Sequence, residues 1–225
     1  MRLGDKKTVM DKRDWTRKDI KQFVCDFLSE LDSFMKTEGF ERRNNGLVYT
    51  RKTGITIQKI DMVFYSNPSY CKNALAHIYP HIQIYFPEIN NTAKIIADNL
   101  IPEKWMDKFT IRQPIQVYTN SKDWCLREPD HYEPIKSEIL TFLKQHTMPL
   151  LDSLTCEEEY IKLFESGDKR IIWDDNQYLY IISAYVNRQE YRKAQQVLVQ
   201  RFGKPGVRKQ YEKVLCILKE RETNE

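Results

Sequence analysis

The sequence predicts an α+β fold, in which an N-terminal helix packs on a mostly antiparallel sheet and a helical C-terminal region follows. Apolar residues recur at steps of three and four up to Gly39. Between there and about residue 126, strand-like segments with a period of two predominate, with one short helix expected among them, and helical spacing returns from about residue 132. Because the strands are grouped rather than interleaved with helices, this order favours α+β over alternating α/β.

The first helix is expected to end at Gly39, because glycine readily adopts the left-handed conformation that terminates a helix. Eight apolar side chains form one stripe along about five turns of this helix. The stripe consists of Ile20, Phe23, Val24, Phe27, Leu28, Leu31, Phe34 and Met35.

A β-hairpin is predicted after this helix. Its first strand contains Tyr49, and residues 52–54 form the turn. The second strand begins at Ile55, and its apolar residues change parity near Gln58 and Lys59. This change of phase predicts a β-bulge.

Residues 76–87 show the clearest strand pattern. Pro80 interrupts it, so the segment is either an edge strand or two strands joined at a kink. Its apolar face carries Ala76, Ile78, Ile82, Ile84 and Phe86. Its other face carries His77, Tyr79, His81, Gln83 and Tyr85.

Three short elements are expected to complete the sheet region. They are a helix over residues 91–100, a strand near 111–117 and a strand at 124–126. A helix then follows from about residue 132, and Pro149 ends or kinks it.

Further helices are predicted beyond Pro149. Thr155-x-x-Glu158 indicates a capping box, and Asp174-Asp175 precedes the next helix. Residues 178–198 show a helical-hairpin pattern that resembles half of a tetratricopeptide-type repeat. A glycine- and proline-containing break at 203–206 comes before a last helix.

The chain is therefore expected to have three parts. Residues 1–14 are polar and aperiodic and form a flexible basic leader, 15–130 form the α+β sheet region, and 131–225 form a helical region packed on it. We expect the second and third parts to make one compact unit.

Charge and cysteine content limit the functional classes. Residues 1–22 hold eight Lys/Arg and four Asp, which accounts for the whole net charge of +4. The neutral remainder argues against a nucleic-acid partner. Five cysteines without a C-x-x-C pair, and the lack of any apolar run of about 20 residues, predict a reduced, cytoplasmic protein that does not enter a membrane.

No cofactor, metal site or catalytic residue is predicted. Glycine is scarce, with seven residues, which argues against a glycine-rich phosphate loop. His77 and His81 have the spacing H-x-x-x-H, but on a strand this spacing separates them by about 13 Å, too far for one zinc ion.

Two groups of residues are candidates for binding. In the polar face of residues 76–87, tyrosine and histidine are amphipathic side chains that suit recognition surfaces, although packing beneath a helix would explain the same row. Around the hairpin, an aromatic–basic patch suits phosphate or carboxylate, or is simply solvated. The patch consists of Arg42, Arg43, Tyr49, Arg51 and Lys52. The binding residues predicted from both groups are Tyr49, Arg51, His77, Tyr79, His81 and Tyr85.

An acidic stretch at 152–175 either faces a basic partner or is solvated.

Several short motifs follow one another between residues 20 and 200. They are Gly39-Phe40, Arg43, Tyr49-Thr50-Arg51, Gly54, Ile57-Gln58, Trp124, residues 148–154, Glu190-Tyr191 and Ala194. Together they resemble an uncharacterised family of bacterial domain-of-unknown-function proteins. The resemblance supplies no catalytic residue. Some members of that family look like immunity partners of bacterial toxins, so the resemblance implies a binding protein.

The leading hypothesis is thus a non-catalytic cytoplasmic module that binds another protein, of the immunity type in its most specific form. One alternative is an enzyme whose polar pocket is assembled from the sheet by His77, His81, Tyr85 and Arg51. A further alternative is weak nucleic-acid binding through the basic N-terminus, which predicts an affinity that falls steeply with salt. The oligomeric state stays open.

Overall fold

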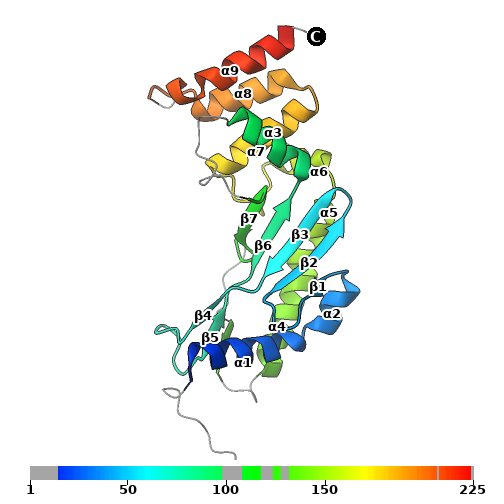
Figure 1. The fold of residues 1–225 in the computed structure, drawn as a ribbon, viewed down its shortest axis with the longest axis vertical. Helices are drawn as coiled ribbons and strands as arrows, with labels where there is room; N and C mark the ends of the chain where they lie inside the picture. The colour runs from blue at the N-terminus through cyan, green and yellow to red at the C-terminus, as the bar shows by residue number, and fades with distance from the viewer. Residues whose placement is uncertain (1–14, 98–107, 118–123, 128–131, 207, 224–225) are drawn as a thin grey trace, which may run out of the picture.

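The computed structural model describes residues 15–97, 108–117, 124–127, 132–206 and 208–223, and it confirms the α+β class (Figure 1). The predicted basic leader lies outside these residues. The helices are α1 (Arg17–Ser29), α2 (Asp32–Thr37), α3 (Pro87–Ile96), α4 (Tyr132–Phe142), the π-helix η4 (Leu143–Thr147), α5 (Met148–Ser153), α6 (Glu157–Glu165), α7 (Asp175–Asn187), α8 (Tyr191–Phe202) and α9 (Arg208–Thr223). The strands are β1 (Glu41–Arg42), β2 (Val48–Thr53), β3 (Thr56–Asp61), β4 (Phe64–Ser66), β5 (Ala76–Ile78), β6 (His81–Tyr85), β7 (Ile111–Pro114) and β8 (Trp124–Leu126).

The strands form two antiparallel sheets. The larger sheet has the order β1-β2-β3-β6-β7, and the smaller has the order β4-β5-β8. In Figure 1 the larger sheet occupies the middle of an elongated molecule, with α1 near one end and α8 and α9 at the other. One hydrophobic cluster runs from Ile20 in α1 to Leu218 in α9, so both regions share a core.

The strand predicted over residues 76–87 is two strands joined at Pro80. β5 is the central strand of the smaller sheet and β6 is an inner strand of the larger one, so the edge-strand alternative is wrong. Proline is tolerated here because it stands between the two ladders, where it replaces no donor. Its carbonyl oxygen accepts a hydrogen bond from the Ile115 amide at 3.0 Å.

The first predicted helix is two helices, α1 and α2. The chain breaks at Glu30 and Leu31, whose amides bond to carbonyls three residues back, at Phe27 and Leu28. The predicted stop at Gly39 is confirmed. Its φ of +78° is left-handed, and the Phe40 amide that follows bonds back to the Met35 carbonyl.

The predicted β-bulge at Gln58 is wrong, because β3 pairs with β2 in regular register from Thr56 to Asp61. The parity of the apolar residues changes for another reason. Gln58 occupies an inward position of the strand while Ile57 points outward, because the Gln58 amide is needed to bond the end of α5. The polar Gln58 is thus buried and the apolar Ile57 points outward, although the strand alternates regularly.

Pro149 does not end the predicted helix. The chain passes from α4 through the π-helix η4 into α5, and the proline lies in the first turn of α5. A π-turn widens the helix where the proline ring would otherwise meet the carbonyl four residues earlier. The capping box predicted at Thr155 is absent, since Cys156 is the N-cap of α6 and makes no side-chain cap bond.

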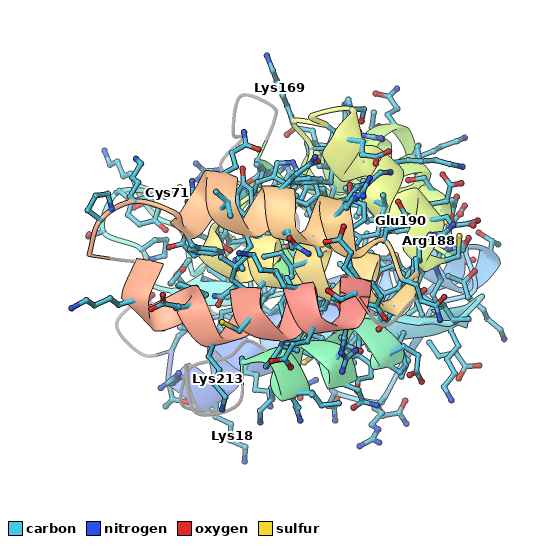
Figure 2. All side chains as sticks on the ribbon, turned by 90° about the horizontal axis from the view of Figure 1, so that it is seen from above. Lys18, Cys71, Lys169, Arg188, Glu190 and Lys213 are labelled. Atoms are coloured by element: carbon cyan, nitrogen blue, oxygen red, sulfur yellow. The ribbon has the colours of Figure 1, made fainter. Side chains whose placement is uncertain are left out.

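The predicted helical hairpin is confirmed as α7 and α8. Ala184 and Ala194 are fully buried, and α7 also packs against α3. Asp174 caps α7, since its Oδ1 accepts from the Gln177 amide at 3.0 Å. Figure 2, viewed from above, shows α7, α8 and α9 side by side. Within the described residues, no helix combines the length and the apolarity that a bilayer crossing requires.

Candidate functional site

The larger sheet has two unlike faces. On β3, Gln58 and Ile60 are buried, whereas Ile57 and Lys59 point to the opposite side and are only half-buried. We name the first side the covered face and the second the open face. Figure 1 shows α4 and α5 behind the strands, and no described helix stands in front of them.

Tyr49, a predicted binding residue, lies on the covered face. Its side chain is 1% exposed, and its hydroxyl lies 2.8 Å from the Leu28 carbonyl oxygen and 2.7 Å from Oδ1 of Asp32, both acceptors. Burial and the neighbouring Asp32 carboxylate raise the pKa of the Tyr49 hydroxyl. Tyr49 therefore belongs to the core and cannot meet a partner, contrary to the sequence prediction.

Arg51, also a predicted binding residue, is on the covered face as well. Its Nε donates to Gln58 at 2.9 Å, its Nη1 to the Glu38 carbonyl at 3.0 Å, and its Nη2 to Asp152 at 2.5 Å. The guanidinium carbon also lies 4.6 Å from the centroid of the Phe40 ring. All three nitrogens are used within the chain, so Arg51 joins the sheet to α2 and α5.

Gln58 and Thr56 complete the end of α5. The Gln58 amide nitrogen donates to the carbonyls of Leu151 at 2.7 Å and Leu154 at 3.0 Å, and the Thr56 hydroxyl lies 3.3 Å from the second of these. The last carbonyls of a helix lack their usual partners within it, so side chains of the sheet bond them here, and the Leu151 carbonyl also accepts from the Leu154 amide at 3.1 Å. Polar side chains of the covered face thus form a hydrogen-bonded network that connects the sheet to α5.

Arg42 makes a similar connection between the sheet and α2. Its Nε and Nη2 bond both carboxylate oxygens of Asp32, at 2.9 and 2.6 Å. Burial opposes ionisation of Asp32, but hydrogen bonds from Arg42 and Tyr49 outweigh it, so the pKa of Asp32 is lowered. The carboxylate therefore stays ionised where α2 meets β1 and β2.

The remaining predicted residues lie on the other side of the sheets. His77, Tyr79 and His81 continue along one side across the kink, with ring centroids 6.1 Å and 5.2 Å apart in succession. Two further rings join them. The ring centroid of Tyr65 in β4 lies 6.2 Å from that of His77, and the ring centroid of Tyr70 lies 5.5 Å from it. We name these five side chains the tyrosine–histidine row.

The two outer tyrosines of the row are its most accessible members. Tyr65 is 51% exposed and Tyr70 is 64% exposed, whereas His77 beneath them is 8% exposed. The Tyr70 hydroxyl lies 2.6 Å from Nδ1 of His77 and holds that ring. Large exposed aromatic side chains over a fixed base are the features that concentrate binding energy at protein interfaces.

His81 connects the row to the open face. It pairs with Asp61 of β3 and with Pro114 of β7, and its Nε2 is buried without a hydrogen-bond partner in the described chain. Burial lowers the pKa of His81, the Arg112 guanidinium lowers it further, and the Asp61 carboxylate opposes this in part. Each of these groups is on a strand beside β6.

The open face continues from His81 as lines of paired residues. Thr50, Lys59, Gln83 and Arg112 are successive partners across β2, β3, β6 and β7. A second line runs through Lys52, Ile57 and Tyr85. Tyr85, the last predicted binding residue, is half-buried in this second line. The face therefore mixes basic, aromatic and aliphatic side chains.

The four residues of the enzyme alternative do not converge on one pocket. Arg51 is on the covered face with its nitrogens engaged, whereas His77, His81 and Tyr85 lie on the other side. The Tyr79 ring stands in contact with both histidines. Among the described residues, no group of three or more His, Cys, Asp or Glu is placed to hold a metal ion.

The acidic stretch at 152–175 is largely neutralised by the chain itself. Asp152 pairs with Arg51, Glu158 with Arg188, Asp168 with Arg170, and Asp175 with Arg201. Figure 2 shows Arg188 and Glu190 together at the turn between α7 and α8. These pairs favour the solvated interpretation of the stretch over a surface for a basic partner.

Sequence reasoning missed three contributors to this site: Tyr65, Tyr70 and Arg112. Tyr65 and Tyr70 belong to β4 and to the connection after it, and antiparallel pairing of β4 with β5 brings them over His77. Arg112 is brought beside β6 by β7. The alternation within β7 was a usable signal for Arg112, but the pairing of β4 with β5 had none.

No family model, curated protein or solved structure matches the chain. The resemblance to the bacterial domain-of-unknown-function family stays a prediction.

Proposed function

We infer that this protein is a non-catalytic cytoplasmic module that binds another protein through the tyrosine–histidine row and the adjoining open face. The observation that carries this proposal is the contrast between the two faces of one sheet. The polar groups of Tyr49, Arg51 and Gln58 on the covered face are all bonded within the chain. The tyrosine–histidine row presents the accessible Tyr65 and Tyr70, and the adjoining open face adds basic and aliphatic side chains, which together have the composition of an interface core and rim.

The proposal extends to the class of partner only through the family resemblance. An immunity-type role would make the partner a bacterial toxin, which this module would bind and block. No catalytic residue is required for that role, and binding energy would come mainly from Tyr65, Tyr70 and Tyr79. The identity of the bound protein decides this narrower form.

Affinity capture from the source cells, with quantitative mass spectrometry, tests the proposal. The tagged wild-type chain is compared with the double variant Tyr65→Ala/Tyr79→Ala. A matched control is Ile95→Ala, which removes a 65% exposed apolar side chain from α3, at the helical end. We expect one stoichiometric protein with the wild type and the control, and its loss with the tyrosine variant.

Two results would contradict the proposal. Capture of no stoichiometric protein would count against a protein-binding function. Capture of the same protein at an unchanged level by the tyrosine variant would leave the function in place but remove the row as its site.

A further inference from the structure

We propose that the open face ends in a groove that binds an acidic, carboxylate-rich segment of the partner protein. This inference rests on the proposed function and names the chemistry of the partner. The groove lies beside β1, where the chain leaves α2, and has a volume of about 820 Å³. Its charged lining consists of Glu41, Arg42, Arg43, Arg51, Lys52 and Lys59.

The cations of the groove fall into two groups. Arg42 and Arg51 belong to the covered face and are paired with Asp32 and Asp152, so they add no uncompensated charge to the groove. In the described part of the chain, Arg43, Lys52 and Lys59 make no ion pair. Three cations against the single carboxylate of Glu41 leave the groove positive, so an anionic segment is complementary to it.

The geometry of the three cations suits an extended segment. Arg43 follows β1 at the edge of the sheet, Lys52 stands on β2, and Lys59 stands on β3, so they cross the open face from one strand to the next. Arg43 and Lys52 are exposed, and the Lys59 ammonium lies 5.2 Å from the centroid of the Phe109 ring. Lys59 is thus the inner end of the line, and its ammonium points toward Phe109, which precedes β7.

The chemistry favours a protein segment over a nucleic acid. Binding of a single strand uses flat aromatic faces on which successive bases stack. Here successive rings of the row are tilted to one another, by 74° for Tyr79 and His81 and by 41° for Tyr65 and Tyr79, so they do not present parallel faces in succession.

The test uses two synthetic probes of equal length on the full chain, a fluorescent oligoglutamate peptide and an oligothymidylate. Binding is followed by fluorescence anisotropy over a range of salt. The groove variant Lys52→Glu/Lys59→Glu is compared with Lys169→Glu/Lys213→Glu, which reverses the same number of charges. Figure 2 shows Lys169 and Lys213 projecting into solvent from other parts of the surface. The variant Lys52→Gln/Lys59→Gln replaces the groove variant if circular dichroism shows that the latter is unfolded.

We expect oligoglutamate to bind, with an affinity that falls as the salt concentration rises. Its affinity should be lower by at least about tenfold in the groove variant, and by less than about twofold in the control variant. No binding of oligoglutamate, or an equal loss in both charge variants, would overturn the inference. Tighter binding of oligothymidylate at the same residues would overturn it in favour of a nucleic acid.

This result is separable from the test of the proposed function. If capture of a partner depends on Tyr65 and Tyr79 while oligoglutamate does not bind, the protein-binding function stands and only the inference that the partner presents an acidic segment is wrong. If oligoglutamate binds in the groove while no partner is captured, the protein-binding function is what fails.

Discussion

The covered and open faces of the larger sheet are built from the same strands, yet they differ in what their polar side chains do. On β3, Gln58 is 0% exposed and bonds α5 and Arg51, whereas its neighbour Lys59 points the other way and makes no ion pair within the described residues. Strand alternation alone produces this difference. A polar residue in a β-strand is therefore a functional candidate only once its face is known.

The largest expected effect comes from breaking the covered face. Gln58→Leu leaves Nε of Arg51 without its acceptor in the core. It also removes one of the two donors of each of the Leu151 and Leu154 carbonyls, which keep the Leu154 amide and the Thr56 hydroxyl. We expect a loss of about 2–3 kcal/mol in the free energy of unfolding, because the charged Arg51 donor would carry its desolvation cost unpaired and two buried hydrogen bonds to carbonyls are lost. Urea denaturation followed by circular dichroism measures it.

The control for this change is Gln83→Leu, the same substitution on the open side of β6. Gln83 is also buried, at 7% exposed, but it donates only one hydrogen bond, to Asp61 at 3.1 Å, and Asp61 is half-buried and can be solvated. A loss below about 1 kcal/mol is expected there. Equal losses for the two glutamine variants would show that the faces do not differ as we describe.

A smaller effect is expected for the hydroxyl of Tyr49. Tyr49→Phe keeps the ring in the core but removes the hydrogen bond that Asp32 accepts, so the pKa of Asp32 rises toward its ordinary value. We expect a loss of about 1–2 kcal/mol at neutral pH. A carboxyl whose pKa is lowered on folding stabilises the fold at pH values above the pKa that it has in the unfolded chain, and this stability is lost on acidification. The free energy of unfolding of the variant should therefore decline less steeply toward low pH than that of the wild type.

Tyr85→Phe, on the open face, is the matched control. Its hydroxyl makes no hydrogen bond within the described residues, so a change within about 0.5 kcal/mol is expected. A large loss in this control would contradict the contrast between the faces.

The smallest effect concerns His81. Its pKa is lowered by burial and by Arg112, so between about pH 7 and pH 5 the folded chain binds fewer protons than the unfolded chain. The stability that neutral His81 contributes is fully present above the ordinary histidine pKa, and it is lost as the pH falls through the lowered pKa of His81 in the folded chain. In thermal unfolding followed over this range, His81→Gln should show a shallower decline than the wild type. Arg112→Gln should lie between them, and identical slopes in all three would contradict the assignment.

Local signals in the sequence predicted much of the fold. Gly39 was recognisable as a helix stop, Asp174 as a cap, and the alternation around Pro80 as a row of tyrosines and histidines on one side. Each of these depends on neighbours in the chain. The α+β class and the α7–α8 hairpin followed from the same periodicities.

The remaining features depend on contacts between distant residues. The position of Gln58 was misread as a bulge because its partners, Leu151 and Leu154, belong to a helix about ninety residues later. Arg51 looked like a binding residue because its acceptors Glu38 and Asp152 were not visible in a hairpin motif. Sequence patterns therefore placed the candidate side chains on strands, but only the packing of the helices decided which face is accessible.

Acetylation footprinting of the lysines, with and without the captured partner, tests most directly whether the open face is the binding surface. The reactivities of Lys52 and Lys59 are compared with those of Lys169 and Lys213 by mass spectrometry. Our interpretation predicts that the partner protects the first pair and leaves the second pair unchanged. Protection of Lys169 or Lys213, with Lys52 and Lys59 as reactive as in the free chain, would contradict it.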